Sequence, residues 1–276
     1  MAGFTSRDDI ILEATTNGKQ DTYHFYKTGS AAQAAGSWHS LWTAAGSPGA
    51  GSAPAATPGV AYVSDATTPV AGSMYFPDRS TDQRYLLSFG AVATTNCTLM
   101  LYDRLAGVGS VSTTTTGAKT LNTAALDRYT GTAGALNEAW LEVSTATTTT
   151  APNVTLTSYT ASDGTTGVSG TAIAFPAAAT VAGAMIQLPM NAAEQGLTAA
   201  ATLTVNTASA AGAVNFLIIR PLARIPLVAN QWNEVSFLDD TLGLPRIYDN
   251  STLGLAYLAS ATTATNFWGT INCAYG

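Results

Sequence analysis

The sequence predicts an all-β protein, a β-sandwich of the jelly-roll type with an extended Ala/Gly/Ser-rich N-terminal arm. Short apolar runs recur between Gly, Asp and Pro turn signals. Thr alternates with apolar residues in several of them, as in half-buried strands. No long stretch shows the 3.6-residue apolar repeat of a helix. We expect residues 1–60 to form a hairpin and the arm, and residues 61–276 to form the sandwich with C-terminal return strands.

The N-terminal part begins with a predicted hairpin. Asn17-Gly18 lies between two strand-like runs within residues 10–26, and Asn-Gly is the preferred dipeptide of a type I′ turn. Residues 28–59 are almost all Ala, Gly, Ser and Pro. Their only large apolar side chains are Trp38, Leu41 and Trp42.

Two interpretations of residues 28–59 stay open. The spacing of Trp38 and Trp42 suits one short helical turn. The segment is either an arm on a neighbouring surface, with the two tryptophans as anchors, or a linker whose tryptophans are buried in the parent domain.

The strands of the sandwich are expected in order along the rest of the chain. They are predicted at residues 85–89, 97–102, 140–144, 154–159, 170–175, 185–190, 201–207 and 214–220, with return strands at 253–258 and 267–273. Aromatic residues are enriched at interface anchor points. Phe267 and Trp268 are therefore further interface candidates, although a place in the core is favoured for Trp268.

The composition favours assembly over life as a free monomer. Of the 276 residues, 46% are hydrophobic, so the chain should fold, but only 10% are charged, against an average of about 25%. A surface with few charges offers little repulsion between copies. The net charge of −6 and the scattered Lys and Arg argue against binding to nucleic acid or to an anionic membrane.

Targeting signals are not apparent. The start of the chain lacks the charged and apolar regions of a secretory signal. No run of about 18 apolar residues predicts a membrane-spanning helix. We expect synthesis in a cytoplasm, with the chain soluble until it assembles.

The familiar catalytic and cofactor motifs are missing. There is no G-x-S-x-G, H-E-x-x-H, phosphate-binding loop or C-x-x-C sequence, and the only histidines are His24 and His39. His24 is expected to be a strand residue. Cys97 and Cys273 are the only cysteines, and two buried free thiols are favoured over a disulfide. No metal or cofactor is expected.

Carboxylate pairs are the remaining candidates for catalysis. Glycoside hydrolysis needs two carboxylates, and Glu138 and Glu142 would share one face of a strand. Asp8-Asp9 and Asp239-Asp240 are adjacent but lack the spacing of an EF-hand loop. Solvated turn carboxylates are the simpler interpretation. We therefore expect that the chain is not an enzyme.

Several segments resemble the head-associated structural proteins of tailed bacteriophages, the decoration or minor capsid class. They include YDRL at 102–105, LDRYT at 126–130, FLIIRPLARIPL at 216–227 and GLPRIYD at 243–249. The resemblance covers about residues 99–276 and involves no motif of fixed chemistry. It implies a β-rich domain, many copies per particle and often a threefold cluster.

The leading hypothesis is therefore a virion structural protein on the capsid exterior, made in the host cytoplasm. Its partners would be the major capsid protein lattice and copies of itself, as a homo-oligomer such as a trimer. The alternative is a tail-associated adhesin module that binds a receptor or a glycan, because jelly-roll domains include lectins. A glycosidase or esterase on a β scaffold is a third hypothesis.

Overall fold

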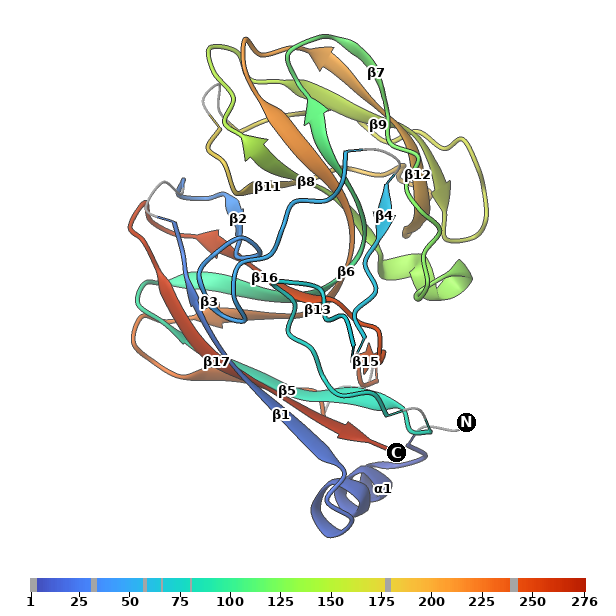
Figure 1. Ribbon diagram of the computed structural model, residues 1–276, viewed down its shortest axis with the longest axis vertical. Coiled ribbons are helices and arrows are strands. Elements are labelled where there is room, and N and C mark those ends of the chain that lie inside the picture. The colour runs from blue at the N-terminus through green and yellow to red at the C-terminus, as the bar shows by residue number, and fades with distance from the viewer. Residues whose placement is uncertain are drawn as a thin grey trace.

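The chain folds into three antiparallel sheets that are stacked from top to bottom in Figure 1. This computed structural model describes residues 4–30, 34–56, 59–65, 67–79, 81–176, 180–238 and 243–276. The predicted all-β class is confirmed. A jelly-roll topology stays a prediction.

The outer sheet, at the bottom of Figure 1, brings together strands from near both ends of the chain. Its order is β14-β5-β17-β1-β3, and β15 also pairs with β5. Every residue of β1 is paired with β17, which lies about 250 positions away in the sequence. The strands are β1 (Gln20–Thr28), β3 (Gly46–Ser47), β5 (Arg84–Ala93), β14 (Asn233–Ser236), β15 (Arg246–Ile247) and β17 (Asn266–Tyr275).

The second sheet closes on itself. Its order is β13-β8-β11-β2-β16-β6, and β6 also pairs with β13, which completes a ring of six strands. We call it the closed sheet. Strand β4 is added along β6. The strands are β2 (Trp38–Ser40), β4 (Val60–Ala61), β6 (Cys97–Ser112), β8 (Glu138–Thr145), β11 (Ala184–Gln187), β13 (Ala213–Leu227) and β16 (Leu253–Ala259).

A small sheet of order β10-β9-β12-β7 forms the top of the molecule (Figure 1). In β9, Val154 and Leu156 are buried while Thr155 and Thr157 are only partly buried, which confirms the predicted alternation. Thr157 Oγ1 lies 2.9 Å from Thr204 Oγ1 on β12. The strands are β7 (Gly117–Thr120), β9 (Asn153–Ala161), β10 (Ile173–Ala174) and β12 (Leu197–Thr207).

The predicted hairpin around Asn17-Gly18 is wrong, because a helix replaces its first strand. Helix α1 (Arg7–Ile11) continues as a π-helical turn, η1 (Leu12–Thr16). The Ser6 side chain caps the helix by accepting a hydrogen bond from the Asp9 N–H. The apolar face of the helix covers one end of the outer sheet, where Ile10 and Ala14 pack on Ala274.

The predicted extended arm is also wrong for residues 38–40 and 46–47, which belong to the chain's own sheets. Strand β2 lies between β11 and β16 in the closed sheet, and β3 pairs with β1. Trp38 therefore lies in a strand and not in a helical turn. The interpretation in which the tryptophans are buried in the parent domain is the correct one. Both large sheets contain strands from each side of residue 60.

One continuous apolar core connects the three sheets, and both cysteines belong to it. Cys97 and Cys273 are buried and free, which confirms the interpretation as free thiols. Burial raises the pKa of the Cys97 thiol to about 12. A second apolar cluster fills the inside of the closed sheet, with Trp38 and Trp140 in edge-to-face contact.

Candidate binding face on the outer sheet

A row of aromatic side chains crosses the solvent-facing side of the outer sheet. Tyr26 of β1 lies opposite Trp268 of β17, which lies opposite Val92 of β5. Directly opposed residues project from the same face. Beyond them, a Cβ atom added at Gly90 would lie 2.5 Å from Trp232 Cζ2. The Trp232 ring therefore lies on the backbone of β5, and the absent side chain of Gly90 makes room for it.

Two of these rings are exposed although they are large and apolar. Trp232 is 52% exposed and Trp268 is 42% exposed. Trp268 packs on Tyr26, with the ring centroids 5.3 Å apart. The Trp232 indole N–H donates to Glu234 at 3.3 Å. Burying an aromatic side chain is strongly favourable, so this row is suited to being covered by a partner.

Short polar side chains lie beside the aromatic row on the same face. Thr22 Oγ1 donates to Asn272 Oδ1 at 2.9 Å, and Asn272 Nδ2 donates to Ser88 Oγ at 3.0 Å. His24 and Thr270 oppose each other between these residues and the row. The face is therefore a flat surface of strands that offers aromatic rings and hydrogen-bonding groups with few charges.

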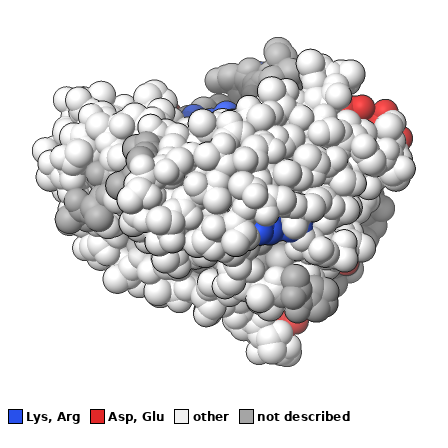
Figure 2. All heavy atoms as spheres, turned by 90° about the horizontal axis from the view of Figure 1, so that it is seen from above, with Lys and Arg blue, Asp and Glu red and all other residues white. Residues whose placement is uncertain are grey.

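Few charges are also visible on the side of the molecule above the small sheet. Figure 2 shows an almost uniformly uncharged face there, with small patches of Lys or Arg and of Asp or Glu mostly toward its edges. This agrees with the charged fraction of 10%. Contacts with a partner across such a surface depend on packing and hydrogen bonds more than on charge.

The five predicted interface residues lie in different environments. Leu41, Trp42 and Phe267 are at most 1% exposed and belong to the interior of the chain itself, so they cannot anchor a partner. Trp38 is mostly inside the closed sheet. Trp268 is exposed, which corrects the preference for a core position. Phe267 and Trp268 point to opposite faces of β17 because successive strand residues alternate.

Sequence reasoning missed Trp232. The signal was present, since Trp232 is followed at every second position by Glu234 and Ser236, whereas Val235 and Phe237 take the alternate positions. That alternation places Trp232 on the polar face of a strand. A large aromatic residue in a polar stripe is a stronger indication of a binding surface than an aromatic residue in a small-residue segment.

The residues considered for catalysis lie apart from one another or are held in contacts within the fold. His24 lies in β1, as expected, while His39 is buried in β2, where burial lowers its pKa. Glu138 and Glu142 share a face of β8. Glu142 is buried beside Arg104.

Asp8 and Asp9 lie in the first turn of α1, where Asp8 is exposed and Asp9 is partly buried. Asp239-Asp240 lies outside the described residues. In the part of the chain that the structure describes, no three His, Cys, Asp or Glu side chains gather as metal ligands. Nor does any described helix have the length and apolarity to cross a membrane.

The comparisons with known proteins yield weak structural similarity alone. No protein family and no curated protein matches the chain. Among solved structures, it is similar to the VP2 subviral particle of infectious bursal disease virus, with 10% identity over 96% of this chain and 85% of that chain and a TM-score of 0.22. The Gx strain of that virus matches with 10% identity over 93% and 41%, and a TM-score of 0.14. TM-scores of this size do not establish a common fold, and nothing about function follows from them.

Proposed function

We propose that this chain is a non-enzymatic virion structural protein that decorates or cements the capsid of a tailed bacteriophage. It packs through the aromatic row of the outer sheet against the major capsid protein or against further copies of itself. The exposed row of Trp232, Trp268 and Tyr26 carries the proposal. The sheets form a rigid scaffold, which we take to be a β-sandwich of the jelly-roll type.

The row has the properties of an interface centre. Trp and Tyr dominate the residues whose truncation weakens protein interfaces most. The strands beneath the row are paired along their length, so little conformational freedom is lost when a partner covers it. Repetition over a lattice then multiplies weak contacts through effective concentration.

The first test is the composition of the native particle. Purified virions should contain this chain on the capsid exterior, at a copy number set by the lattice. Its absence from the particle would refute the proposal.

The second test is the aromatic row itself. Trp268→Ala and Trp232→Ala should each weaken binding to particles that lack the protein by about 30-fold or more, since truncating a central anchor costs about 2 kcal/mol. Leu12→Ala is the matched control, because Leu12 is 50% exposed but lies outside the row. Equal losses in all three variants would show that the row is not the contact.

The polar side chains beside the row favour a second candidate, a glycan-binding or receptor-binding module of the tail. Aromatic rings next to Thr22, Asn272 and Ser88 offer the stacking and hydrogen bonds that a sugar requires. A glycan array with the isolated protein tests this candidate, together with stoichiometry. A few copies at a tail tip would favour it over hundreds of copies on a head.

A further inference from the structure

A groove outside the aromatic row contains two arginines that have no carboxylate partner among the described residues. Its central hollow has a volume of about 420 Å³ and lies between β13, the 3-10 helix η2 (Gly131–Leu136) and the segment 243–248. Arg220 and Arg246 line it together with Tyr129 and Tyr248. These residues come from three of the sequence segments that carry the phage resemblance, and the aromatic row uses none of them.

The two arginines are held by stacking. The Arg220 Cζ atom lies 4.9 Å from the centroid of the Tyr129 ring, and the Arg246 Cζ atom lies 4.2 Å from that of Tyr248. The two tyrosine rings meet edge to face, with centroids 4.9 Å apart. A guanidinium stacked on a ring keeps its N–H edges available for a planar acceptor such as a carboxylate.

Neither arginine is neutralised within the described part of the chain. Arg220 donates to the backbone oxygen of Ala133 at 2.9 Å, and burial lowers the pKa of its guanidinium. The Nε of Arg246 is buried without a hydrogen-bond partner. By contrast, the ion pairs of the described residues give a carboxylate to Arg79, Arg84, Arg104, Arg128 and Arg224.

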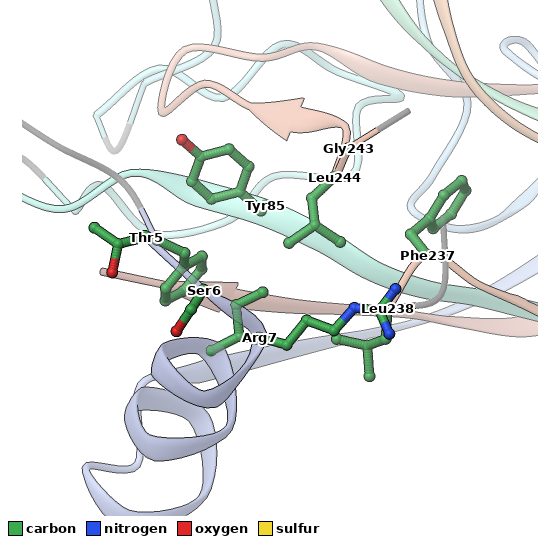
Figure 3. Close-up of a pocket in the computed structure, with 10 residues that line it drawn as sticks. Thr5, Ser6, Arg7, Tyr85, Phe237, Leu238, Gly243 and Leu244 are labelled. Atoms are coloured by element: carbon green, nitrogen blue, oxygen red, sulfur yellow. The ribbon is translucent and has the colours of Figure 1, made fainter. Parts of the chain in front are cut away.

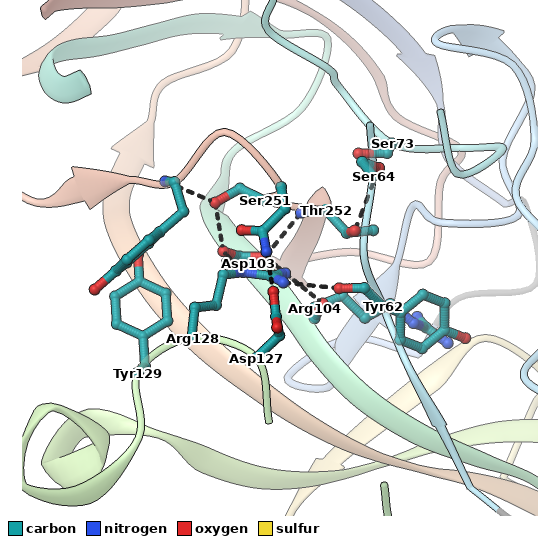
Figure 4. Close-up of polar contacts among 12 residues, drawn as sticks. Tyr62, Ser64, Ser73, Asp103, Arg104, Asp127, Arg128, Tyr129, Ser251 and Thr252 are labelled. Carbon is teal, nitrogen blue, oxygen red and sulfur yellow. Dashed lines mark hydrogen bonds and ion pairs between the residues drawn. The ribbon is translucent and has the colours of Figure 1, made fainter. Parts of the chain in front are cut away.

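The surrounding structure holds Tyr129 in place. Its neighbour Arg128 donates from Nε to Asp103 Oδ2 at 2.7 Å and pairs with the other carboxylate oxygen as well (Figure 4). The Tyr129 hydroxyl donates to the backbone oxygen of Arg246 at 2.5 Å. Tyr129 also has a φ of 52°, which is uncommon for a residue other than glycine. The hollow is therefore preorganised.

Two hollows, each lined by apolar and polar side chains, adjoin the central one through different walls. One, of about 450 Å³, shares Leu136 and Leu222 with it. The other, of about 250 Å³, shares Leu244 with it and is closed by Ile10 of helix α1. Figure 3 shows this second hollow, with Leu244, Leu238 and Tyr85 around it. The groove thus offers a cationic centre between two hollows that each include apolar walls, Leu136 and Val235 in one and Leu244 and Ile10 in the other.

We propose that this groove binds an extended segment of a partner protein, with an Asp or Glu side chain held by Arg220 and Arg246 and apolar side chains in the adjoining hollows. Charge complementarity selects the acidic residue, because two half-buried cations without counter-ions favour an anion. Three hollows in succession fit the alternate side chains of an extended peptide better than they fit a single compact ligand. The inference rests on the proposed function in one respect, namely that the partner is another protein.

The test is a selection from a random peptide display library on the full-length chain and on its Arg220→Gln/Arg246→Gln variant. The unmodified chain should enrich peptides with an acidic residue flanked by apolar residues, and the double variant should not. Lys119→Gln, which removes one positive charge on β7, is the control and should enrich the same peptides as the unmodified chain. Thermal melting checks that each variant is folded.

A second measurement uses the unmodified chain and so does not depend on the folding of a variant. The best selected peptide and its amide counterpart (Asn for Asp, Gln for Glu) are compared by calorimetric titration, and the amide should bind at least tenfold more weakly. Enrichment of no acidic sequence, or equal binding of acid and amide, overturns the groove proposal. Incorporation into particles is measured separately. A negative result with the peptides would therefore overturn the groove proposal without refuting the proposed structural function.

Discussion

Strand β8 carries two glutamates that pair with arginines at two ends of the closed sheet, and the two ends differ in exposure. Glu142 and Arg104 have side chains that are 4% and 0% exposed. Glu138 and Arg224 have side chains that are 19% and 44% exposed. The same pair of residue types is therefore buried in protein at one end and partly exposed to water at the other.

The buried end is enclosed by rings but poorly hydrogen-bonded. Arg104 lies 4.7 Å from the ring of Trp42 and 4.8 Å from that of Tyr62. Its Nη2 is 3.5 Å from Glu142 Oε2, and none of its side-chain nitrogens has a hydrogen-bond partner among the described residues. Asn215 Nδ2 donates to Glu142 at 3.0 Å.

The exposed end has better hydrogen bonds, but its ion pair contributes less to the stability of the fold. Arg224 Nη2 donates to both Glu138 oxygens, at 3.1 and 3.2 Å, and the Trp140 indole N–H donates to Glu138 at 2.8 Å. Water screens the charges of this pair, so its loss lowers the free energy of unfolding only slightly. Solvent access, more than hydrogen-bond geometry, therefore decides how much each of these ion pairs contributes to stability.

The largest effect is expected from Glu142→Gln. The change keeps the shape of the side chain but leaves the buried Arg104 without a counter-charge, which costs about 3–5 kcal/mol. Urea unfolding followed by tryptophan fluorescence measures the loss. A loss below about 1 kcal/mol would mean that Arg104 does not depend on Glu142.

Removing both charges is the matched control. Because Arg104 is poorly hydrogen-bonded, the double change Arg104→Met/Glu142→Leu should recover most of the stability that Glu142→Gln loses. Buried ion pairs are often replaced by apolar residues without cost. A double variant no more stable than Glu142→Gln would contradict this account of the buried end.

An intermediate effect is expected at Lys27, a buried cation without a carboxylate partner in the described structure. Its Nζ donates to the backbone oxygens of Ala44 and Gly49, both at 3.2 Å. Burial lowers the pKa of Lys27 to about 8, against about 10.4 in an unfolded chain. Between these values the unfolded chain binds more protons, so stability rises with pH.

Lys27→Met should remove that rise, which we expect to be roughly 1–3 kcal/mol across the window. Urea midpoints at pH 7, 8, 9 and 10 for both proteins measure it. Cysteines and tyrosines titrate in the same range, but they are common to both proteins and cancel in the difference. Parallel pH profiles would show that Lys27 stays protonated when folded.

The smallest effect is expected from Glu138→Ala. It should cost less than about 1 kcal/mol in dilute buffer, because the ion pair with Arg224 is partly exposed. In 1 M salt the difference should shrink further, since the Debye length falls to about 3 Å. A loss as large as that of Glu142→Gln would remove the distinction between the two ends.

Local patterns predicted most of the long strands well. The expected strand at 253–258 is β16 (Leu253–Ala259), and the one at 267–273 is β17 (Asn266–Tyr275). The strand expected to stop at residue 89 instead continues to Ala93, because residues 90–93 pair with β17, and the Trp232 ring lies on Gly90. The sequence does not distinguish a glycine that ends a strand from a glycine on which an aromatic ring packs.

The N-terminal part was predicted poorly for a different reason. Residues 38–40 are a strand because β11 and β16 lie on either side of them, and both of those strands come from much later in the chain. The Ala, Gly and Ser residues around Trp42 suggested an arm. In the structure, however, a Cβ atom at Gly51 would collide with the Trp42 ring, and one at Gly72 would collide with Gly51.

By itself, then, the sequence determined the all-β class, the positions of the long strands and the scarcity of charge, because these depend on local alternation and on composition. Only the tertiary structure decided which tryptophans are buried. Trp42 became a core residue because it packs against Tyr62 and Arg104. Trp268 became a surface residue because its strand pairs with β1, about 240 positions away. The face of a side chain depends on its partners, and pairing between distant strands is not encoded in the neighbouring residues.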